Sequence, residues 1–427
     1  MVQMIEFNFT EYLSARWGKG RELSEFSHLL ELLGDPQLTF RCIHVAGTNG
    51  KGSTCSYTQS ILQEQGFKTG LYTSPALKYV NERIMVCGVP VDNETIEQAA
   101  YRVYQAEMQS GFHYGGFDRM TATALVVFAQ AGVEFAVLET GLGGRLDATN
   151  ACKSEIAIIT SIGLDHMHIL GNTIEEIAME KCGIIKSEQK YVVSHRQDPR
   201  VEAIIAKTCE KMGVKLLQTK DYKIVLNYID QYRQYFDIIA PNGAAFSFDS
   251  GLLGRHQLEN ACAAWLTCRA LKLDPICIKE GISNAQWRGR LELLQGSPDV
   301  LLDGAHNPQA TEVLVSSLDE YFIGRKFVLI TTVMRDKDYP TIVSMTSPKV
   351  SNVITVSIGE RSVDPNELAK LYQMHDVPAK TSNSIEQAYH DALSICKEMG
   401  EDAMILVTGS LYLVGEFRDY LMSLEQE

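Results

Sequence analysis

The sequence lacks the features that mark secreted, membrane-spanning and disulfide-stapled proteins. Its 10 cysteines are scattered, none forms a CxxC pair and no zinc-ligand spacing occurs, so we expect reduced and mostly buried thiols. No apolar stretch approaches the roughly 18 residues of a transmembrane helix. The first residues carry acidic side chains and no apolar signal-peptide core, so we expect a cytoplasmic protein without a membrane partner.

Basic charge is also scarce. The chain has 39 Lys and Arg against 53 Asp and Glu, a formal net charge of −14. This balance argues against nucleic acid as a partner, although a few local cations and backbone N–H groups can still hold a small anion. The length of 427 residues and the hydrophobic content of 45% suggest two or three domains with full cores.

Short apolar runs alternate with helix-like stretches in the first half of the chain. The runs are apolar through most of their length, as parallel strands buried on both faces should be. The expected strands are 41–46, 135–139, 156–160 and 191–194, and the expected helices are 54–65, 91–110, 121–131, 174–186 and 199–212. This alternation predicts an α/β fold with a doubly wound sheet.

The second half differs in two places. Aromatic alternation over 222–251 predicts antiparallel hairpins, and a helix is expected over 257–271. After a polar, turn-rich break at 294–298 the strand rhythm restarts, with strands expected at 300–302, 327–330, 352–356 and 403–407. We therefore expect a large P-loop-type doubly wound domain over 1–294 with a small antiparallel insertion, and a smaller C-terminal Rossmann-like α/β domain over 299–427.

A glycine-rich turn with a lysine joins the first predicted strand to the next helix. Such a turn presents backbone N–H groups and a helix N-terminus to phosphate, and Lys51 can reach a β- or γ-phosphate. The turn departs from GxxxxGK[ST], because Val45 replaces its first glycine and Gly52 its hydroxyl residue. A turn without a ligand is the alternative, and the lysine and the upstream strand count against it. The candidate phosphate-binding residues are Gly47, Thr48, Asn49, Gly50, Lys51, Gly52 and Ser53.

Four further polar residues occupy positions where ligands can bind. Glu139 ends a predicted strand before a run of glycines, which suits a Mg²⁺ ligand and equally a capping carboxylate. Ser74 precedes proline, so a turn hydroxyl is its simpler interpretation. For His166, a structural histidine is the simpler interpretation. Lys181 lies within a predicted helix, where a solvated surface lysine is the simpler interpretation.

Taken in order, these motifs resemble those of the folylpolyglutamate synthase and dihydrofolate synthase family of the Mur ligase superfamily. The matching strings are HVAGTNGKGS at 44–53, TSP at 73–75, ETGLGGRLDATN at 139–150, DH at 165–166, EKCGI at 180–184, GRHQLEN at 254–260, WRGRLE at 287–292, DGAHNP at 303–308 and TGS at 408–410. The resemblance covers nearly the whole chain. One departure is Arg288, where the family commonly has proline.

The resemblance implies an ATP-dependent ligase that activates a carboxylate as an acyl phosphate. It implies two Mg²⁺ ions, held by Ser74, Glu139, His166 and a carbamylated Lys181. It also implies that Asn260 contacts adenine, and that Arg290 and Asp303 reach the nucleotide when the domains close. The implied catalytic set is Lys51, Glu139, His166, Lys181, Arg290 and His306.

For the remaining substrates the resemblance implies a folate or pteroate as the carboxylic acid and L-glutamate as the amine. The implied substrate-binding residues are Arg83, Thr121, Asp147 and Ser410. The chain departs from the family here, with Ala76 in place of histidine, Asp118 in place of glutamate, and no Pro-Thr in 111–116. Ordinary drift and a paralogue that uses a different acid both remain open, as does a non-catalytic ATP-binding regulator. We expect a monomer.

Overall fold

The computed structural model describes residues 7–14, 22–230 and 232–424. The N-terminal residues on which the signal-peptide prediction depends lie largely outside these ranges. The described chain forms two compact units. The first contains the described residues up to Asn227, with Tyr235–Ser250 and Gln257–Gln286; the second contains Tyr228–Gln234, Gly251–His256 and the described residues from Trp287 onward.

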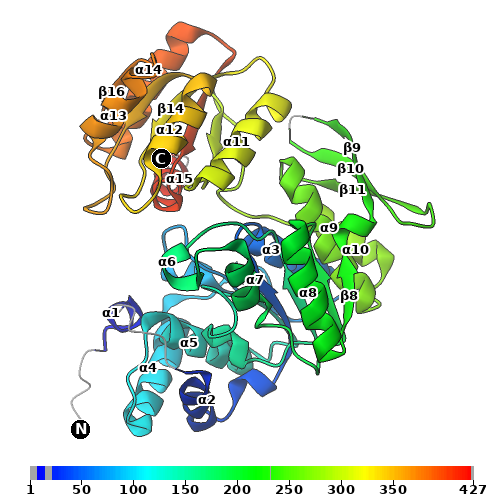
Figure 1. The fold of residues 1–427 in the computed structure, drawn as a ribbon. Coiled ribbons are helices and arrows are strands. Elements are labelled where there is room, and N and C mark those ends of the chain that lie inside the picture. The colour runs from blue at the N-terminus through cyan, green and yellow to red at the C-terminus, as the bar shows by residue number, and fades with distance from the viewer. Residues whose placement is uncertain (1–6, 15–21, 231, 425–427) are drawn as a thin grey trace. The chain divides into compact units, whose positions relative to one another are not determined.

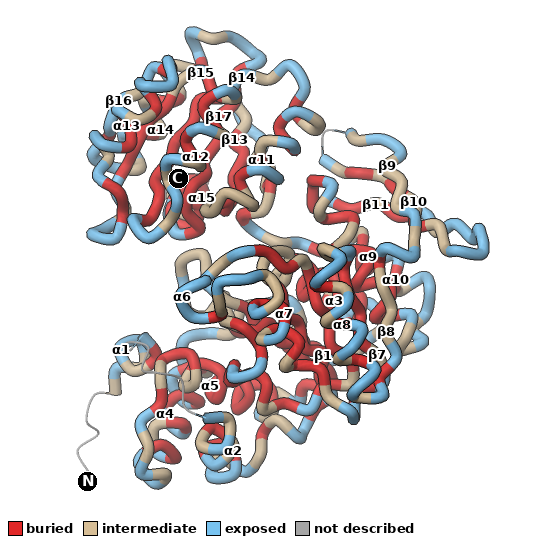
Figure 2. Tube along the Cα trace, viewed as in Figure 1, coloured by how far each residue is buried: buried red, intermediate tan, exposed pale blue. Residues whose placement is uncertain are grey.

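The first unit is built on a doubly wound sheet, as predicted (Figure 1). Its strand order is β4 (Val89–Pro90), β3 (Ile84–Val86), β2 (Thr69–Tyr72), β5 (Phe135–Glu139), β1 (Arg41–Ala46), β6 (Ile156–Ile159), β7 (Tyr191–Ser194) and β8 (Lys215–Gln218). The strands from β2 to β8 in this order pair in parallel, and β3 and β4 form an antiparallel edge. The central strands are buried through nearly their whole length, which is why they read as continuous apolar runs (Figure 2).

Helices cover this sheet, and three of the helices listed next begin earlier than the sequence predicted. The helices of the first unit are α1 (Phe9–Ser14), α2 (Leu23–Leu32), α3 (Lys51–Glu64), α4 (Asn93–Ser110), α5 (Gly116–Ala131), α6 (Met167–Leu170), α7 (Ile174–Cys182), α8 (Pro199–Met212), α9 (Arg255–Ala270) and α10 (Pro275–Asn284). Helix α3 starts at Lys51 because Gly50 takes a left-handed φ of 84° at its N-cap. Helix α5 starts at Gly116, where Asp118 accepts a hydrogen bond from the Gly115 amide.

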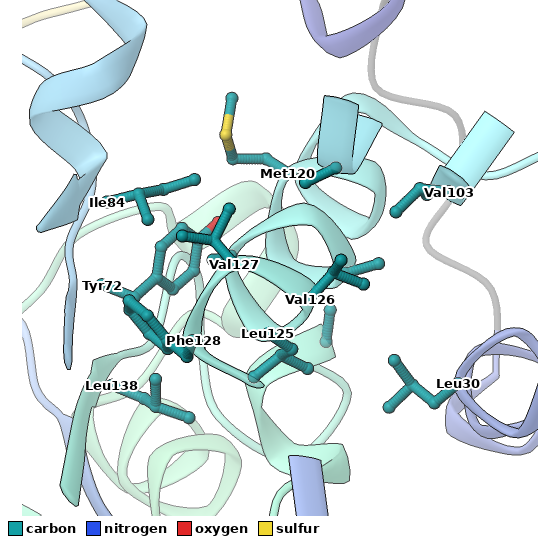
Figure 3. Close-up of a cluster of buried hydrophobic side chains, with 14 of the residues drawn as sticks. Leu30, Tyr72, Ile84, Val103, Met120, Leu125, Val126, Val127, Phe128 and Leu138 are labelled. Carbon is teal, nitrogen blue, oxygen red and sulfur yellow. The ribbon is translucent and has the colours of Figure 1, made fainter. Parts of the chain in front are cut away.

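The hydrophobic core beside β2 and β5 is closed by a buried ion pair. Figure 3 shows α5 between Tyr72 and Leu138 of the sheet and Leu30 of α2. On the neighbouring helix α4, Glu107 is 1% exposed and accepts hydrogen bonds from Arg119, at 2.7 and 2.9 Å, and from the Tyr12 hydroxyl at 2.6 Å. These bonds tie α1, α4 and α5 together.

The region predicted as hairpins is a three-stranded sheet in the order β11 (Ala245–Ser250), β10 (Gln234–Ile239) and β9 (Lys223–Ile229). Strands β10 and β11 are joined by a turn at 240–244, and between β9 and β10 the Asp230 amide donates to the Arg233 carbonyl at 3.0 Å. Phe246 and Phe248 pack their rings against Trp265 of α9, at centroid distances of 5.1 and 6.4 Å. This aromatic contact explains the alternation in the sequence.

The second unit is a six-stranded α/β sheet in the order β12 (Glu292–Leu294), β13 (Val300–Leu302), β17 (Ala403–Thr408), β14 (Lys326–Thr331), β15 (Val350–Thr355) and β16 (Ala379–Thr381). Its helices are α11 (Pro308–Tyr321), α12 (Tyr339–Thr346), α13 (Pro365–Gln373), α14 (Ile385–Met399) and α15 (Leu411–Leu424). Strand β12 pairs antiparallel with β13. The polar break at 295–298 is therefore a hairpin turn within this sheet, and the last segment of the second unit begins at Trp287.

Two sequence-wide features complete the fold. All ten cysteines are free thiols, and all but Cys87 and Cys277 are buried, as predicted. Among the described residues, no helix combines the length and apolarity needed to cross a membrane.

Candidate active site

The polar residues singled out in the first half of the sequence gather at the carboxyl edge of the first sheet. The central strand β1 lies between β5 and β6; the chain passes from β1 to β2 on the β5 side, and later from β5 across β1 to β6. In open α/β sheets the ligand crevice forms at such a switch point, outside the carboxyl ends of the strands.

The phosphate loop follows β1 and packs against the end of β6. A Cβ on Gly47 would fall 1.8 Å from Thr160 Oγ1, so this position accepts only glycine. The amides of Thr48 and Asn49 donate to the Ser161 carbonyl at 2.8 and 3.3 Å. These contacts hold the loop in one conformation ahead of the N-terminus of α3, the geometry that binds phosphate.

Three predicted residues meet beside this loop. Lys51 Nζ lies 3.2 Å from the Thr48 carbonyl and 3.8 Å from Glu139 Oε1. The other carboxylate oxygen of Glu139 accepts a hydrogen bond from the Ser74 amide at 3.1 Å. Glu139 is only 4% exposed, so a cation beside it is needed to stabilise its charge.

Lys181 is a buried lysine, unlike the solvated residue that its helix position alone would suggest. It lies in the last turn of α7 and is 4% exposed. Its Nζ donates to the Gly47 carbonyl at 2.6 Å. Burial, followed by repulsion from Lys51, lowers the pKa of Lys181 to about 7. A large fraction of this amine is therefore neutral near pH 7.

His166 lies between β6 and α6. It adopts a left-handed φ of 49° at the N-cap of α6, and its side chain is 43% exposed, with Nε2 at 3.9 Å from Asp165 Oδ2. Within the described ranges, no three or more His, Cys, Asp and Glu side chains cluster closely enough to hold a metal ion. The expected ligand set contains only two such residues, Glu139 and His166, and Lys181 would join them only after carbamylation.

The predicted adenine residue Asn260 contacts the start of α3. A Cβ on Gly50 would fall 2.5 Å from Asn260 Oδ1, and this oxygen accepts a hydrogen bond from Thr54 at 3.3 Å. Gln257, which the sequence interpretation missed although it lies in the GRHQLEN string, joins Asn260 to the loop. It accepts from Asn260 Nδ2 at 2.8 Å and donates to Ser53 Oγ at 3.2 Å.

Two residues of the predicted acid-binding set, Thr121 and Asp147, are buried. Thr121 donates to the Phe117 carbonyl at 2.8 Å, and its hydroxyl lies 3.2 Å from the Tyr72 hydroxyl. Asp147 accepts hydrogen bonds from the Leu142 amide at 2.9 Å and from Thr149.

Two other residues lie nearby. Arg83 ends the 3₁₀ turn Val80–Arg83, where its carbonyl accepts from the Thr73 amide at 3.1 Å. Burial, with repulsion from Asp147, raises the pKa of Asp118 to about 6 although the Gly115 amide opposes this.

The second unit brings together the residues predicted in its own strings. Both carboxylate oxygens of Asp303 are used by the unit's own backbone, since they accept from the amides of Leu291 and Ala305 at 2.9 Å each. Arg290 Nη1 donates to the Gly289 carbonyl at 3.2 Å, and His306 Nδ1 bonds the Gly304 carbonyl at 2.8 Å. In this structure Asp303 thus holds the loop that carries Arg290.

Ser410, predicted to bind substrate, lies at the start of α15. It is 2% exposed, and its hydroxyl accepts from the Tyr412 amide at 3.2 Å. In this structure the hydroxyl therefore caps the helix.

Known proteins are similar to this chain in both sequence and fold. The Mur ligase middle domain matches residues 45–268, and the Mur ligase, glutamate ligase domain matches residues 289–411. The dihydrofolate synthase/folylpolyglutamate synthase of Bacillus subtilis is 33% identical over 97% of this chain and 100% of its own length.

Two solved structures superpose over almost all of the chain. Folylpolyglutamate synthase of Mycobacterium tuberculosis complexed with ADP has a TM-score of 0.88 at 29% identity, covering 96% of this chain and 97% of that one. Escherichia coli FolC in complex with DHPP and ADP has a TM-score of 0.86 at 28% identity, covering 97% of each chain. The chain belongs to the dihydrofolate synthase/folylpolyglutamate synthase family of Mur ligases and is an ATP-dependent ligase.

Proposed function

We propose that the chain joins L-glutamate to a folate, or to dihydropteroate, with release of ADP and phosphate. The observation that carries this proposal is the group at the phosphate loop: Lys51 beside the buried Glu139, and the buried Lys181 amine bonded to the loop itself. The relatives' names supply the class of acid and amine.

The reaction needs activation because a carboxylate has no adequate leaving group. In the first step a carboxylate oxygen attacks the γ-phosphorus of ATP, the bond to the β-phosphate oxygen breaks, and ADP leaves. In the second step the amine nitrogen attacks the acyl carbon, loses a proton, and phosphate departs with the carboxylate oxygen. The protein's contribution is to position the reactants and to neutralise charge.

Each residue around the loop has a role in this scheme. The amides at the N-terminus of α3 and the ammonium of Lys51 stabilise the phosphates. Asn260 and Gln257 hold the start of α3, and the family resemblance implies that Asn260 contacts adenine. Arg290 and His306, and Ser410 for the substrate, keep the roles that the family resemblance implies.

A magnesium ion suits the residues at the end of β5. Glu139 supplies a buried carboxylate; Ser74, whose amide bonds that carboxylate, would supply a hydroxyl, and His166, which follows β6, a partly exposed imidazole. When bound, Mg²⁺ neutralises charge on the phosphates. Lys181 would complete the set as a carbamate, which forms when the neutral amine attacks carbon dioxide and loses a proton. A pKa near 7 favours this reaction, because only the neutral amine is nucleophilic.

Asp118 caps α5, since its carboxylate accepts from the Gly115 amide at 3.2 Å. Glutamate at the same helix position can fill this role too, so the exchange leaves the helix cap in place. This favours drift over a change of substrate. A ligase for a different acid remains the second candidate, because the chain also departs from the family at Ala76, two residues after Ser74.

Steady-state ADP release distinguishes these functions. We expect release that requires ATP, L-glutamate and either dihydropteroate or tetrahydrofolate, each acid being assayed separately. ADP release that requires neither acid nor glutamate would refute the ligase proposal and indicate an ATPase or regulator. Release with neither folate-type acid but with another carboxylic acid would support the second candidate.

A further inference from the structure

His44 precedes the phosphate loop and has no role in the proposed chemistry, yet it is fully buried. It lies on β1, in register between Leu138 of β5 and Ala157 of β6. Burial, with repulsion from Lys186, lowers the pKa of His44 to about 3. The imidazole is therefore neutral, with one N–H donor and one acceptor nitrogen.

The imidazole belongs to a chain of hydrogen bonds. His44 Nε2 lies 2.8 Å from Thr149 Oγ1, and Thr149 Oγ1 donates to Asp147 Oδ1 at 2.5 Å. A hydroxyl has a single hydrogen, so Thr149 must accept from His44 if it donates to Asp147. The chain thus places the imidazole proton on Nε2. Within the described structure His44 Nδ1 has no hydrogen-bond partner, and in this tautomer it carries no proton that would need one.

The hydrogen-bond chain ends at the carboxylate of Asp147, which holds the loop that follows β5. Asp147 also accepts from the amides of Thr149, at 3.1 Å, and of Leu142, at 2.9 Å. It caps the 3₁₀ turn Ala148–Ala151 and closes the segment that begins after Glu139. Its orientation is therefore set by donors from three places: the segment after β5, the turn itself, and β1 through Thr149.

The hydrogen bonds among His44, Thr149 and Asp147 involve none of the residues that the phosphate loop packs against. The loop packs toward Thr160 at the end of β6 and toward Asn260 of α9. Ala148 of the turn and Cys152, which follows it, belong instead to the core that contains Tyr72. The hydrogen-bond chain thus runs from β1, which carries the phosphate loop, toward β5 and β2 at the carboxyl edge of the sheet.

We propose that His44 and Thr149 are positioning residues that orient Asp147, and the loop it closes, toward the carboxylic acid substrate. The inference rests on the proposed function, in which that acid is a folate or pteroate. Neither residue needs to touch a reactant. The chain instead fixes the acid-binding side of the edge relative to the strand that presents ATP.

Variants of the full chain separate this role from a merely structural one. Thr149→Val keeps the shape and removes the hydroxyl, and should raise KM for the acid about tenfold while KM for ATP changes less than about twofold. Thr149→Ser restores the hydroxyl and should return KM for the acid to near the wild-type value. Thr267→Val, which removes a buried hydroxyl bonded only within α9, is the matched control and should leave both constants unchanged.

A spectroscopic readout tests the same chain without activity. Nitrogen-15 NMR of labelled histidine should show His44 as a neutral Nε2–H tautomer that does not titrate between pH 5 and 8, and Thr149→Val should perturb its signal. A His44 protonated on Nδ1 or titrating in this range would overturn the inference. Equal increases in both KM values for Thr149→Val, or no rescue by Thr149→Ser, would overturn it as well. An inactive wild-type chain with the expected His44 tautomer would refute the proposed function and the orienting role, but leave the hydrogen-bond chain itself standing.

Discussion

Replacing Lys181 by methionine should make the protein more stable near neutral pH while abolishing ligase activity. The folded-state pKa of about 7 lies well below the ordinary value of 10.5. Between these two values the unfolded chain binds more protons than the folded chain, so this residue makes wild-type stability rise with pH across that window.

The size of the effect follows from that pKa difference. Holding this amine in the buried site costs about 4 kcal/mol at pH 7 and about 2 kcal/mol at pH 9. Methionine has a similar length and carries no charge, so Lys181→Met removes this cost. It also removes the hydrogen bond to the Gly47 carbonyl, a loss of about 1 kcal/mol. We expect a net gain of about 3 kcal/mol at pH 7 that shrinks to about 1 kcal/mol at pH 9.

The assay is urea unfolding of both proteins at pH 7, 8 and 9 in buffer free of carbon dioxide, followed through Trp265. The other two of the chain's 3 tryptophans are replaced by phenylalanine in both proteins, so that the signal reports on the first unit. Added bicarbonate should flatten the wild-type pH dependence, because a carbamate is no longer a basic amine, and leave the variant unchanged. Stability curves that run parallel with pH would refute the reasoning.

Two further substitutions test the fold around the site. Gly50→Ala forces a side chain into a left-handed φ of 84° and brings its Cβ to 2.5 Å from Asn260, so KM for ATP should rise about tenfold in steady-state assays. Arg119→Met leaves the Glu107 carboxylate buried without its partner, and should lower the free energy of unfolding by about 3–5 kcal/mol in urea titrations.

Each of these predictions has a matched control. Gly66 has a similar φ of 93° but open space around its Cβ, so Gly66→Ala should reduce stability without raising KM for ATP. The side chain of Arg200 is 61% exposed although it forms ion pairs, so Arg200→Met should lower the free energy of unfolding by less than about 1 kcal/mol. If either control matched its test variant, the close contact or the burial would not be the cause.

The strands and most helices were predictable because each follows from a local pattern. Runs such as 135–139 and 191–194 are apolar through most of their length, and both form strands within the predicted bounds. The start of α3 was not predictable from apolar periodicity, because it depends on the left-handed backbone of Gly50. The hairpin at 295–298 was misplaced as a domain boundary for a similar reason. A polar turn looks the same within a sheet as between domains, and only the pairing of β12 with β13 decides.

The place of the candidate site in the fold was predictable from the sequence, and its electrostatics were not. Strand ends identified Glu139 and the phosphate loop, since polar residues at that edge face a ligand crevice. Nothing in the sequence around Lys181 indicates that its amine is buried against Gly47, because the contact joins residues far apart in the chain. His44 escaped notice for the same reason, since its partner Thr149 comes from a distant turn.

The acyl-phosphate intermediate is the central claim, and an isotope transfer tests it most directly. The acid that supports ADP release is labelled with oxygen-18 in its carboxylate and allowed to react with ATP and L-glutamate, and the released phosphate is analysed by mass spectrometry. The account predicts one labelled oxygen in each phosphate, because the attacking carboxylate oxygen leaves with the phosphoryl group. Unlabelled phosphate accompanying amide formation would contradict it.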